Sequence, residues 1–342
     1  MSRPDERSAV YIPPPGLDRA LASLPLVDTA GRGAHHIGYL TNYSFHIWYQ
    51  TVMEVITRRA RQYGASVEVH DAELSVARQL DGARDLLTRV DALVLTPAAD
   101  AGVEPVLTLA AERGVPVVVE ANPVAGMTTL VAICDYDAGV KLGRWVGTNV
   151  RPRYGAALRI LDVALPTLRP CLLRSEGFVD GVRSVQPGAH VVAQLNGQGS
   201  AIVGREEAGR VFRTSHDIDV IFAMDDETGQ GAYSAWLDAG GAPDGVTLAT
   251  FGLAGDHEKD LLASGGVLAV CAAMFPEYVG VKCVDAVMRL RAGGAAPRRD
   301  VTPTVPMTPD LLGRYYPKPD GVWTPDLNAI ASIAVESVCA RE

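Results

Sequence analysis

Short apolar runs alternate with longer amphipathic stretches from residue 36 onward, and this alternation predicts strands followed by helices. The first set begins with HIGYL and closes with VPVVVE, and runs of this length and β-branched content are typical of buried strands. We expect strands at 36–40, 66–69, 92–97 and 115–120, and helices over about 46–63, 75–89 and 102–113. Connections of this length between consecutive strands imply parallel pairing in a doubly wound sheet.

A second set of the same kind follows a bridging strand at 129–134 and a helix at 137–149. Its expected strands are 157–163, 190–195, 219–224, 246–251 and 267–274, with helices near 171–185, 201–214, 228–239, 256–264 and 276–293. An extended piece at 300–307, a short helix capped by Thr308 and a helical segment at 326–339 complete the chain. The two sets predict an α/β fold of two Rossmann-like lobes with parallel sheets, in which ligands bind beyond the carboxyl ends of the strands.

Composition narrows the classes of function. The 342 residues are 48% hydrophobic, enough for a large core, but no apolar run reaches the roughly 18 residues that a membrane helix needs. A net charge of −9 argues against a nucleic-acid surface. The polar N-terminus lacks the pattern of a secretory signal, which favours a cytoplasmic location if the chain is complete.

Five cysteines form an odd set without a CxxC pair. Cys134, Cys271 and Cys283 lie within apolar runs, so we expect buried free thiols rather than a disulfide framework or a zinc site. Several free thiols fit a reducing compartment. His35 and His36 could mimic a metal pair, but no third ligand lies near in sequence, and we expect no metal and no cofactor.

Three consecutive acids, Asp225, Asp226 and Glu227, follow the strand at 219–224. Such acids can hold a metal, share a proton in catalysis or bind the hydroxyls of a ligand. For Asp225 the alternatives are ligand contact and capping of the helix near Thr228, while Glu227 is expected to be solvated. No G-x-G-x-x-G follows the first strand, and neither GxxxxGK[ST] nor G-x-S-x-G occurs, so nucleotide hydrolysis and serine-hydrolase chemistry lack support.

The layout resembles the type I periplasmic binding proteins, specifically the ribose/galactose-type solute-binding family that sugar ABC transporters share with LacI-type effector domains. The resemblance covers about residues 36–316 and rests on five segments in order: VPVVVEANP, CDYDAGVKLGRWVG, RSEGFVDGV, IFAMDDETGQGAYSAWLDAGG and VLAVCAAMFPEYVGVKCVDAVMRLRAGG. In the fourth segment the family commonly shows Ala-x-Asn-Asp-x-x-Ala-x-Gly-Ala. The fifth looks like the family's strand, hinge and long helix.

The resemblance implies a clamshell that closes over a small solute, with three hinge crossings near Ala132–Cys134, Ala273–Pro276 and Val301–Pro306. The implied parts are an N-terminal extension (1–35), an N-terminal lobe (36–132 plus 275–300), a C-terminal lobe (133–274 plus 301–316) and a C-terminal tail (317–342). The resemblance also implies a periplasmic or cell-envelope location and an ABC transporter permease as partner. No catalysis, nucleic-acid partner or direct membrane insertion is expected.

The family's pocket is altered where it can be matched residue by residue. Thr96 replaces an asparagine, Asp225 replaces the asparagine of the Asn-Asp pair, and Leu253 replaces an aspartate. An arginine position falls on Leu172, with Arg174 two residues further on. The expected ligand-binding residues are Tyr43, Phe45, His46, Thr96, Glu120, Asn122, Asp135, Leu172, Arg174, Asp225, Leu253 and Met274.

Several of these positions carry alternatives. Asn122 falls at the family's Asp-Arg pair, although a shift of one residue would offer Glu120. Asp135 could bond across the lobes or cap the helix at 137. His46 could be a wall of the ligand site or a partly exposed helix residue, and Asp226 is expected to support the hinge or a neighbouring loop, as the family's second acid does.

The altered pocket predicts an atypical ligand. Two arginines and several amides are lost, and each hydroxyl bond left unmade costs roughly 1–3 kcal/mol, so a densely hydroxylated hexose should bind poorly. An anion is also disfavoured. We hypothesise a smaller or less polar solute, sugar-like, polyol or amine-bearing, whose amine would pair with Asp225 between the rings of Tyr43, Phe45 and Trp48.

Three functions compete. The favoured one is non-enzymatic binding of a solute as the substrate-binding component of an ABC importer. The second is a cytoplasmic ligand sensor on the same fold without its own DNA-binding domain, since the N-terminal 35 residues lack a basic helix. The third is an α/β enzyme that uses Asp225 and Asp226 as a metal or acid–base pair, which would show metal binding and turnover.

Overall fold

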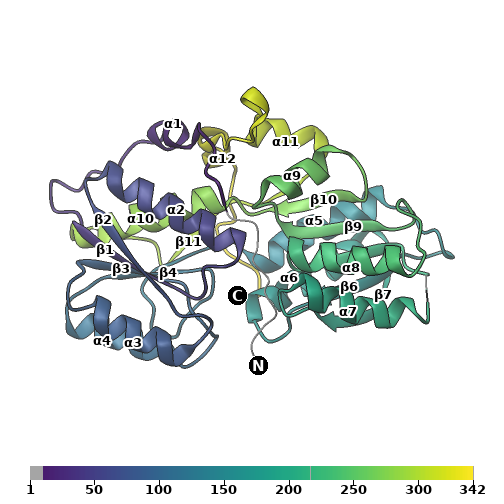
Figure 1. The fold of residues 1–342 in the computed structure, drawn as a ribbon, viewed down its shortest axis with the longest axis horizontal. Coiled ribbons are helices and arrows are strands. Elements are labelled where there is room, and N and C mark those ends of the chain that lie inside the picture. The colour runs from purple at the N-terminus through teal and green to yellow at the C-terminus, as the bar shows by residue number, and fades with distance from the viewer. Residues whose placement is uncertain (1–10, 216, 342) are drawn as a thin grey trace. The chain divides into compact units, whose positions relative to one another are not determined.

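The computed structural model describes residues 11–215 and 217–341, which form two compact units (Figure 1). Unit 1 comprises the chain up to Ala132, then Phe275–Thr302 and Tyr315–Ala334; unit 2 comprises Ile133–Met274, Pro303–Arg314 and the chain from Val335. The chain changes unit after Ala132, Met274 and Thr302, within the three segments where crossings were expected. It changes unit twice more in the C-terminal part, after Arg314 and after Ala334. The domain limits expected from the sequence stay a prediction, and the first ten residues of the expected N-terminal extension lie outside the described residues.

Unit 1 is built on a six-stranded sheet of order β11-β5-β4-β3-β1-β2 with parallel neighbours. Its strands are β1 (His36–Thr41), β2 (Ser66–Asp71), β3 (Ala92–Leu95), β4 (Val117–Glu120), β5 (Leu130–Ala132) and β11 (Arg299–Val301). Its helices are α1 (Leu17–Ala22), α2 (Ile47–Gln62), α3 (Val76–Leu86), α4 (Glu104–Glu112), α10 (Pro276–Arg291) and α12 (Leu327–Ala331), with a 3₁₀ turn at Pro319–Gly321.

The side chains of the unit 1 strands point alternately to the two faces of the sheet, and both faces are apolar. Ile37 and Tyr39 of β1 pack with α2 and α10, whereas Leu40 joins the cluster under α3 and α4. Figure 1 shows these helix pairs on opposite faces of the sheet. Because side chains of a strand alternate between faces, a strand buried on both sides is apolar on both, which is why β3 and the first three residues of β4 form continuous hydrophobic runs.

Unit 2 repeats this plan with the order β12-β10-β9-β8-β6-β7, where only β12 runs antiparallel to its neighbour. Its strands are β6 (Arg159–Ala164), β7 (His190–Asn196), β8 (Val220–Ala223), β9 (Thr247–Gly252), β10 (Leu268–Ala273) and β12 (Val305–Met307). Its helices are α5 (Asp135–Asn149), α6 (Arg169–Val185), α7 (Ala201–Phe212), α8 (Asp226–Asp238), α9 (Asp256–Ala263) and α11 (Pro309–Tyr315).

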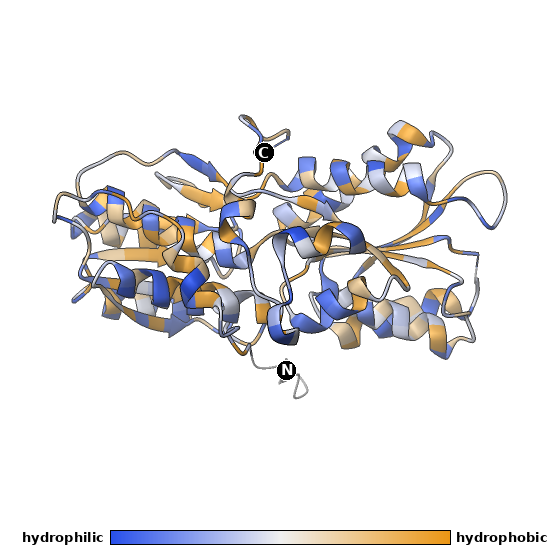
Figure 2. Cartoon of the chain, turned by 90° about the horizontal axis from the view of Figure 1, so that it is seen from above, coloured by the Kyte–Doolittle hydropathy of each residue, from blue (hydrophilic) through white to orange (hydrophobic). Residues whose placement is uncertain are grey.

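Aromatic side chains fill the core of unit 2. The Phe178 ring on α6 stacks on the Phe222 ring of β8 with centroids 4.1 Å apart, and Phe222 meets Phe251 of β9 edge to face at 6.1 Å. Trp236 of α8 packs edge to face with Phe212 of α7 at 5.4 Å. In Figure 2 the strands are mostly hydrophobic and the helices mix both kinds of residue, as expected for sheets covered on two faces. The expected α/β class with two mainly parallel sheets is confirmed.

Glycines let α5 and α6 approach to backbone contact. A β-carbon added at Gly143 would collide with the carbonyl oxygen of Phe178, and one added at Gly177 would collide with the carbonyl oxygen of Tyr136. Gly139 faces the carbonyl oxygen of Arg174 in the same way. The two helices therefore pack more closely than side chains normally allow, and the start of α5 is fixed against α6.

Two expectations about the C-terminal part are wrong. The extended piece at 300–307 is two strands in different sheets, because the chain passes from unit 1 to unit 2 between β11 and β12. The helix expected at 326–339 is limited to α12, which ends at Ala331. The remaining residues of this segment are not helical. They leave unit 1 at Val335, and the disulfide of Cys339 with Cys134 holds them at the N-terminus of α5.

The expectation of free cysteines is wrong for one pair. Cys134 and Cys339 form a disulfide, while Cys171, Cys271 and Cys283 are buried and belong to no disulfide among the described residues. The pairing joins residues 205 positions apart, and only the return of the tail to α5 brings them together. None of the described helices is long and apolar enough to cross a membrane.

We predict that Gly143→Ala destabilises the protein by about 3 kcal/mol or more, because its new β-carbon meets backbone that cannot turn away. Chemical denaturation followed by circular dichroism measures the change. Gly313→Ala is the matched control: this helical glycine has nothing within 4 Å of an added β-carbon, so the substitution should stabilise α11 by roughly 0.5–1 kcal/mol. Equal effects of the two substitutions would contradict close backbone packing.

Candidate functional site

In unit 1, rings gather where β1 ends. The Tyr43 ring lies 5.3 Å from the Tyr49 ring and 6.2 Å from the His46 ring, and the His46 and Tyr49 rings are 6.1 Å apart. His46 is the N-cap of α2, and its Nδ1 accepts a hydrogen bond of 3.1 Å from the backbone N–H of Trp48. Tyr49 was not expected at the site, although its spacing of three residues from His46 places both on one helix face.

Buried polar side chains lie at the ends of β3 and β4. The Thr96 hydroxyl donates to Oε2 of Glu120 at 2.8 Å and lies 3.2 Å from the hydroxyl of Tyr39. Thr96 and Glu120 are almost completely buried, and burial together with the charge of Glu120 raises the pKa of Tyr39 well above its ordinary value. The strand-end rule selects Thr96 and Glu120 but not their partner Tyr39, which lies inside the apolar run of β1.

Backbone strain marks the ends of two strands. Ala121, directly after β4, has φ 63°, and Leu253, directly after β9, has φ 59°. Residues with a β-carbon rarely adopt this left-handed conformation, and it costs of order 1–3 kcal/mol where the surroundings impose it. Both turns carry residues expected at the site: Asn122 donates its backbone N–H to the carbonyl of Glu120 at 2.9 Å, and Leu253 is fully buried.

In unit 2 an ion pair joins α5 to α6. Nε of Arg174 donates to Oδ1 of Asp135 at 2.7 Å, its Nη1 donates to the carbonyl oxygen of Met224 at 3.2 Å, and its guanidinium lies 5.2 Å from the ring centroid of Phe251. The Arg174 side chain is 14% exposed and that of Asp135 3%. Asp135 is the first residue of α5, so it does not cap a helix beginning at 137.

The three acids after β8 have three different surroundings. Asp225 is the N-cap of α8, and its Oδ1 accepts a hydrogen bond of 2.7 Å from the N–H of Thr228. Asp226 is buried, and Glu227 is a half-buried residue of the first turn. The helix begins at Asp226, two residues before the expected start. Capping, one of the two alternatives for Asp225, is observed; its contact with a ligand stays a prediction.

Asp226 organises the turn after β9. Its Oδ2 accepts from the N–H of Leu253 at 2.6 Å, and its Oδ1 accepts from the hydroxyl of Thr250 at 2.5 Å and from Sγ of Cys271 at 3.3 Å. Burial, and secondly the negative charge of Glu258, raise the pKa of Asp226 to about 7. Asp226 therefore supports a neighbouring loop, as expected.

Lys259 holds the other side of the same turn. Its Nζ donates to the carbonyl oxygens of Ala254 and Gly255 at 3.0 and 3.2 Å, and its side chain is 3% exposed. Lys259 on α9 and Asp226 on α8 therefore both bond the turn that connects β9 to α9. Neither bond could be anticipated from spacing along the chain.

Other expected residues lie apart from these bonded groups. Phe45 is 55% exposed, and Trp48 packs against the core of unit 1, so neither joins the ring cluster of Tyr43, His46 and Tyr49. Leu172 is half-buried in the first turn of α6. Met274 is 6% exposed, and its backbone N–H donates to the carbonyl of Gly252 at 3.2 Å.

These side chains suit hydrogen bonding and stacking. Among residues 11–215 and 217–341, no group of three or more His, Cys, Asp or Glu residues could hold a metal ion. Carboxylates, a guanidinium, hydroxyls and ring faces at strand ends are the groups with which proteins bind small polar molecules.

We predict that the free energy of unfolding of the wild-type protein falls as the pH rises from about 4 to about 7. Folded Asp226 keeps its proton up to about pH 7, whereas the unfolded chain releases it near pH 4, so the stabilisation is complete only below the lower pKa. The asparagine of Asp226→Asn is neutral at every pH, can accept from the N–H of Leu253 and can donate to the hydroxyl of Thr250. The substitution should therefore abolish this fall in the free energy of unfolding, which is on the order of 2–4 kcal/mol in the wild type.

Urea denaturation of both proteins between pH 4 and pH 8 measures this difference. Asp81→Asn removes an exposed carboxylate from α3 and controls for the change in net charge. Parallel stability curves for wild type and Asp226→Asn would contradict the raised pKa.

Comparisons with known proteins agree with this architecture. A family model described as a periplasmic binding protein domain matches residues 37–295. No curated protein matches the chain. A galactofuranose binding protein of known structure is 19% identical with a TM-score of 0.72, over 81% of this chain and 95% of that chain.

Two further solved structures are similar. A protein from Mycobacterium smegmatis in complex with β-D-fucofuranose is 21% identical with a TM-score of 0.75, over 88% of this chain and 99% of the other. An ABC transporter solute binding protein from Bacillus halodurans C-125 with bound myo-inositol is 18% identical with a TM-score of 0.71, over 82% and 96% of the two chains. At these identities the likeness shows the fold. Together with the family model it confirms the resemblance to the type I periplasmic binding proteins, and the chain belongs to the periplasmic binding protein family.

Proposed function

We propose that this protein binds a small, uncharged, hydroxylated solute without transforming it, as the solute-binding component of an ABC importer. The observation that carries the proposal is the ion pair of Asp135 and Arg174, held at the strand ends of unit 2 beside the carbonyl of Met224 and the ring of Phe251. A guanidinium supplies hydrogen-bond donors and a carboxylate supplies acceptors, which is the combination that sugar hydroxyls require.

The charge of this pair favours a neutral ligand. Arg174 is balanced by Asp135 at 2.7 Å, so an anion would have to compete with a carboxylate already in place. The family's arginine position falls on Leu172, but Arg174, two residues further on, supplies a guanidinium donor in its place. A polyol or sugar is therefore less disfavoured than the sequence alone suggests.

Aromatic groups support the same class of ligand. The rings of Tyr43, His46 and Tyr49 form one cluster. Ring faces pack against the C–H faces of sugars, while the polar edges of tyrosine and histidine offer hydrogen bonds. The proteins of similar fold that hold galactofuranose, β-D-fucofuranose or myo-inositol point to the same chemistry.

The importer role rests on membership of the family, whose implied partner is an ABC transporter permease. The disulfide adds support, because such bonds persist in oxidising compartments, where importers of this class collect their solutes. Binding alone requires no proton transfer and no bond cleavage.

A thermal-shift screen of the purified protein tests the proposal. The library should contain uncharged pentoses, hexoses and inositols, acidic sugars, small amines, nucleosides and divalent metals. A ligand at 100 times its Kd should stabilise the protein by about 2.7 kcal/mol, which appears as a raised Tm. Stabilisation by uncharged polyols supports the proposal. Stabilisation by acidic sugars alone, amines alone or metals alone would overturn it.

We predict that Arg174→Gln and Asp135→Asn each weaken binding of the best uncharged ligand at least tenfold, because either change leaves a charged partner uncompensated and removes groups that bond hydroxyls. Calorimetric titration measures Kd, and denaturation of the same samples checks that they remain folded. Arg169→Gln removes an exposed arginine near the start of the same helix and should leave Kd unchanged. Unchanged affinity in the folded Arg174 and Asp135 variants would contradict their role.

A further inference from the structure

The C-terminal tail belongs to both units in turn. Tyr315–Ala334 are part of unit 1, and the chain from Val335 is part of unit 2, where Cys339 is bonded to Cys134. Cys134 is the N-cap of α5 and lies two residues after Ala132, where the chain passes from unit 1 to unit 2. The disulfide therefore secures the end of the chain at the first crossing between the units.

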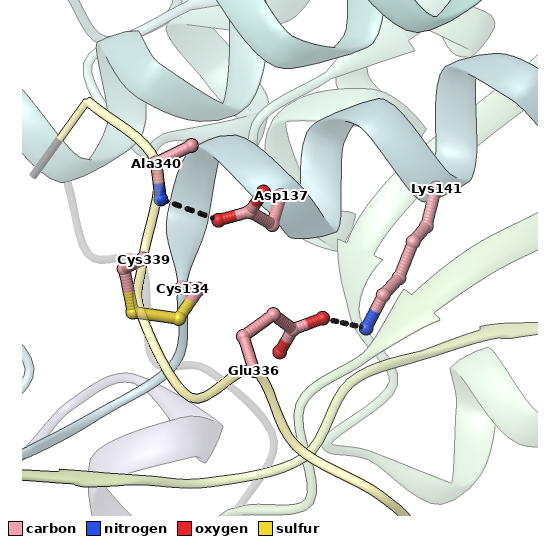
Figure 3. The surroundings of a disulfide bond; sticks show 6 residues. All are labelled: Cys134, Asp137, Lys141, Glu336, Cys339 and Ala340. Atoms are coloured by element: carbon pink, nitrogen blue, oxygen red, sulfur yellow. Dashed lines mark hydrogen bonds and ion pairs between the residues drawn. A yellow bond between two sulfur atoms is a disulfide. The ribbon is translucent and has the colours of Figure 1, made fainter.

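The other contacts of the tail are polar and lie around the bond (Figure 3). The N–H of Ala340 donates to Oδ2 of Asp137 at 2.8 Å, and Glu336 forms an ion pair with Lys141. Both partners on α5 belong to its first two turns.

Arg341 reaches α5 and α6. Its Nη2 donates to Oδ2 of Asp180 at 2.9 Å, and its guanidinium lies 4.2 Å from the ring centroid of Tyr136. The Arg341 and Asp180 side chains are 49% and 42% exposed. Ion pairs between exposed groups contribute little to stability, so this pair cannot hold the tail in place by itself.

Apolar burial adds little to the attachment. Val335 is 45% exposed and Val338 is 81% exposed, so the segment between the crossing and the disulfide presents its hydrophobic side chains to solvent. The covalent bond is thus the principal attachment of the tail to unit 2.

The bond is reducible from its tail side. Cys134 is 2% exposed and Cys339 is half-buried, so a dithiol attacks Sγ of Cys339 and Cys134 leaves as the thiolate. The leaving thiolate lies at the N-terminus of α5, where the helix dipole stabilises negative charge, and the charge of the adjacent Asp135 is compensated by Arg174.

We propose that the Cys134–Cys339 disulfide is a redox-controlled latch. Closed, it holds the tail on α5 and orders the turn that carries Asp135. Reduction by a dithiol transfers two electrons and two protons, converts the bond to two thiols and leaves the dithiol as a disulfide. The tail from Val335 then leaves α5, its covalent attachment to unit 2 is lost, and the first turn of α5 becomes mobile.

Hydrogen–deuterium exchange with mass spectrometry tests the latch on air-oxidised protein. We expect the backbone amides of residues 135–140 and 335–341 to exchange at least tenfold faster after addition of dithiothreitol, and in the Cys134→Ser, Cys339→Ser double variant without reductant. Thiol titration of the denatured protein should give three thiols before reduction and five afterwards. Five before reduction would overturn the proposal.

A truncated chain ending at Ala334 separates the latch from other effects of the reductant. Its first turn of α5 should exchange as fast as in the reduced wild type, with no further response to dithiothreitol. Unchanged exchange in the reduced wild type, or an equal response in the truncated chain, would also overturn the proposal. The exchange readout needs no ligand, so failure of the latch is distinguishable from failure of the proposed binding function.

Discussion

The backbone contact between α5 and α6 is the constraint on which the candidate site of unit 2 depends. Glycines at 139, 143 and 177 leave no room for a β-carbon, so the two helices are held at a fixed separation. This separation places Asp135, the first residue of α5, within 2.7 Å of Arg174 on α6. Cys134, the residue that anchors the tail, is the N-cap of the same helix α5.

Elsewhere in unit 2, buried ionisable side chains hold the backbone of the turn after β9. Asp226 accepts from the N–H of Leu253 and Lys259 donates to the carbonyl of Ala254, so one short turn is bonded from two helices. A left-handed residue such as Leu253 persists only when its surroundings impose that conformation. The acids that first suggested a catalytic cluster therefore include a cap, Asp225, and a loop support, Asp226.

The sequence predicted the repeated strand–helix order, because buried parallel strands leave continuous apolar runs that need no tertiary information to recognise. It also placed Thr96, Glu120 and Asp135 at strand or helix ends. Side-chain direction could not be predicted: Arg174 stood two positions from the family's arginine, yet it pairs with Asp135. The disulfide was missed because no local spacing connects cysteines 205 residues apart.

Non-enzymatic binding of a neutral hydroxylated solute is the central claim, and calorimetric titration of the oxidised wild-type protein with the best hit from a polyol and sugar library tests it most directly. The account predicts saturable binding of one ligand per chain, with the ligand recovered chemically unchanged after prolonged incubation. A failure of every uncharged polyol and sugar to bind, or conversion of the bound ligand to a product, would contradict it.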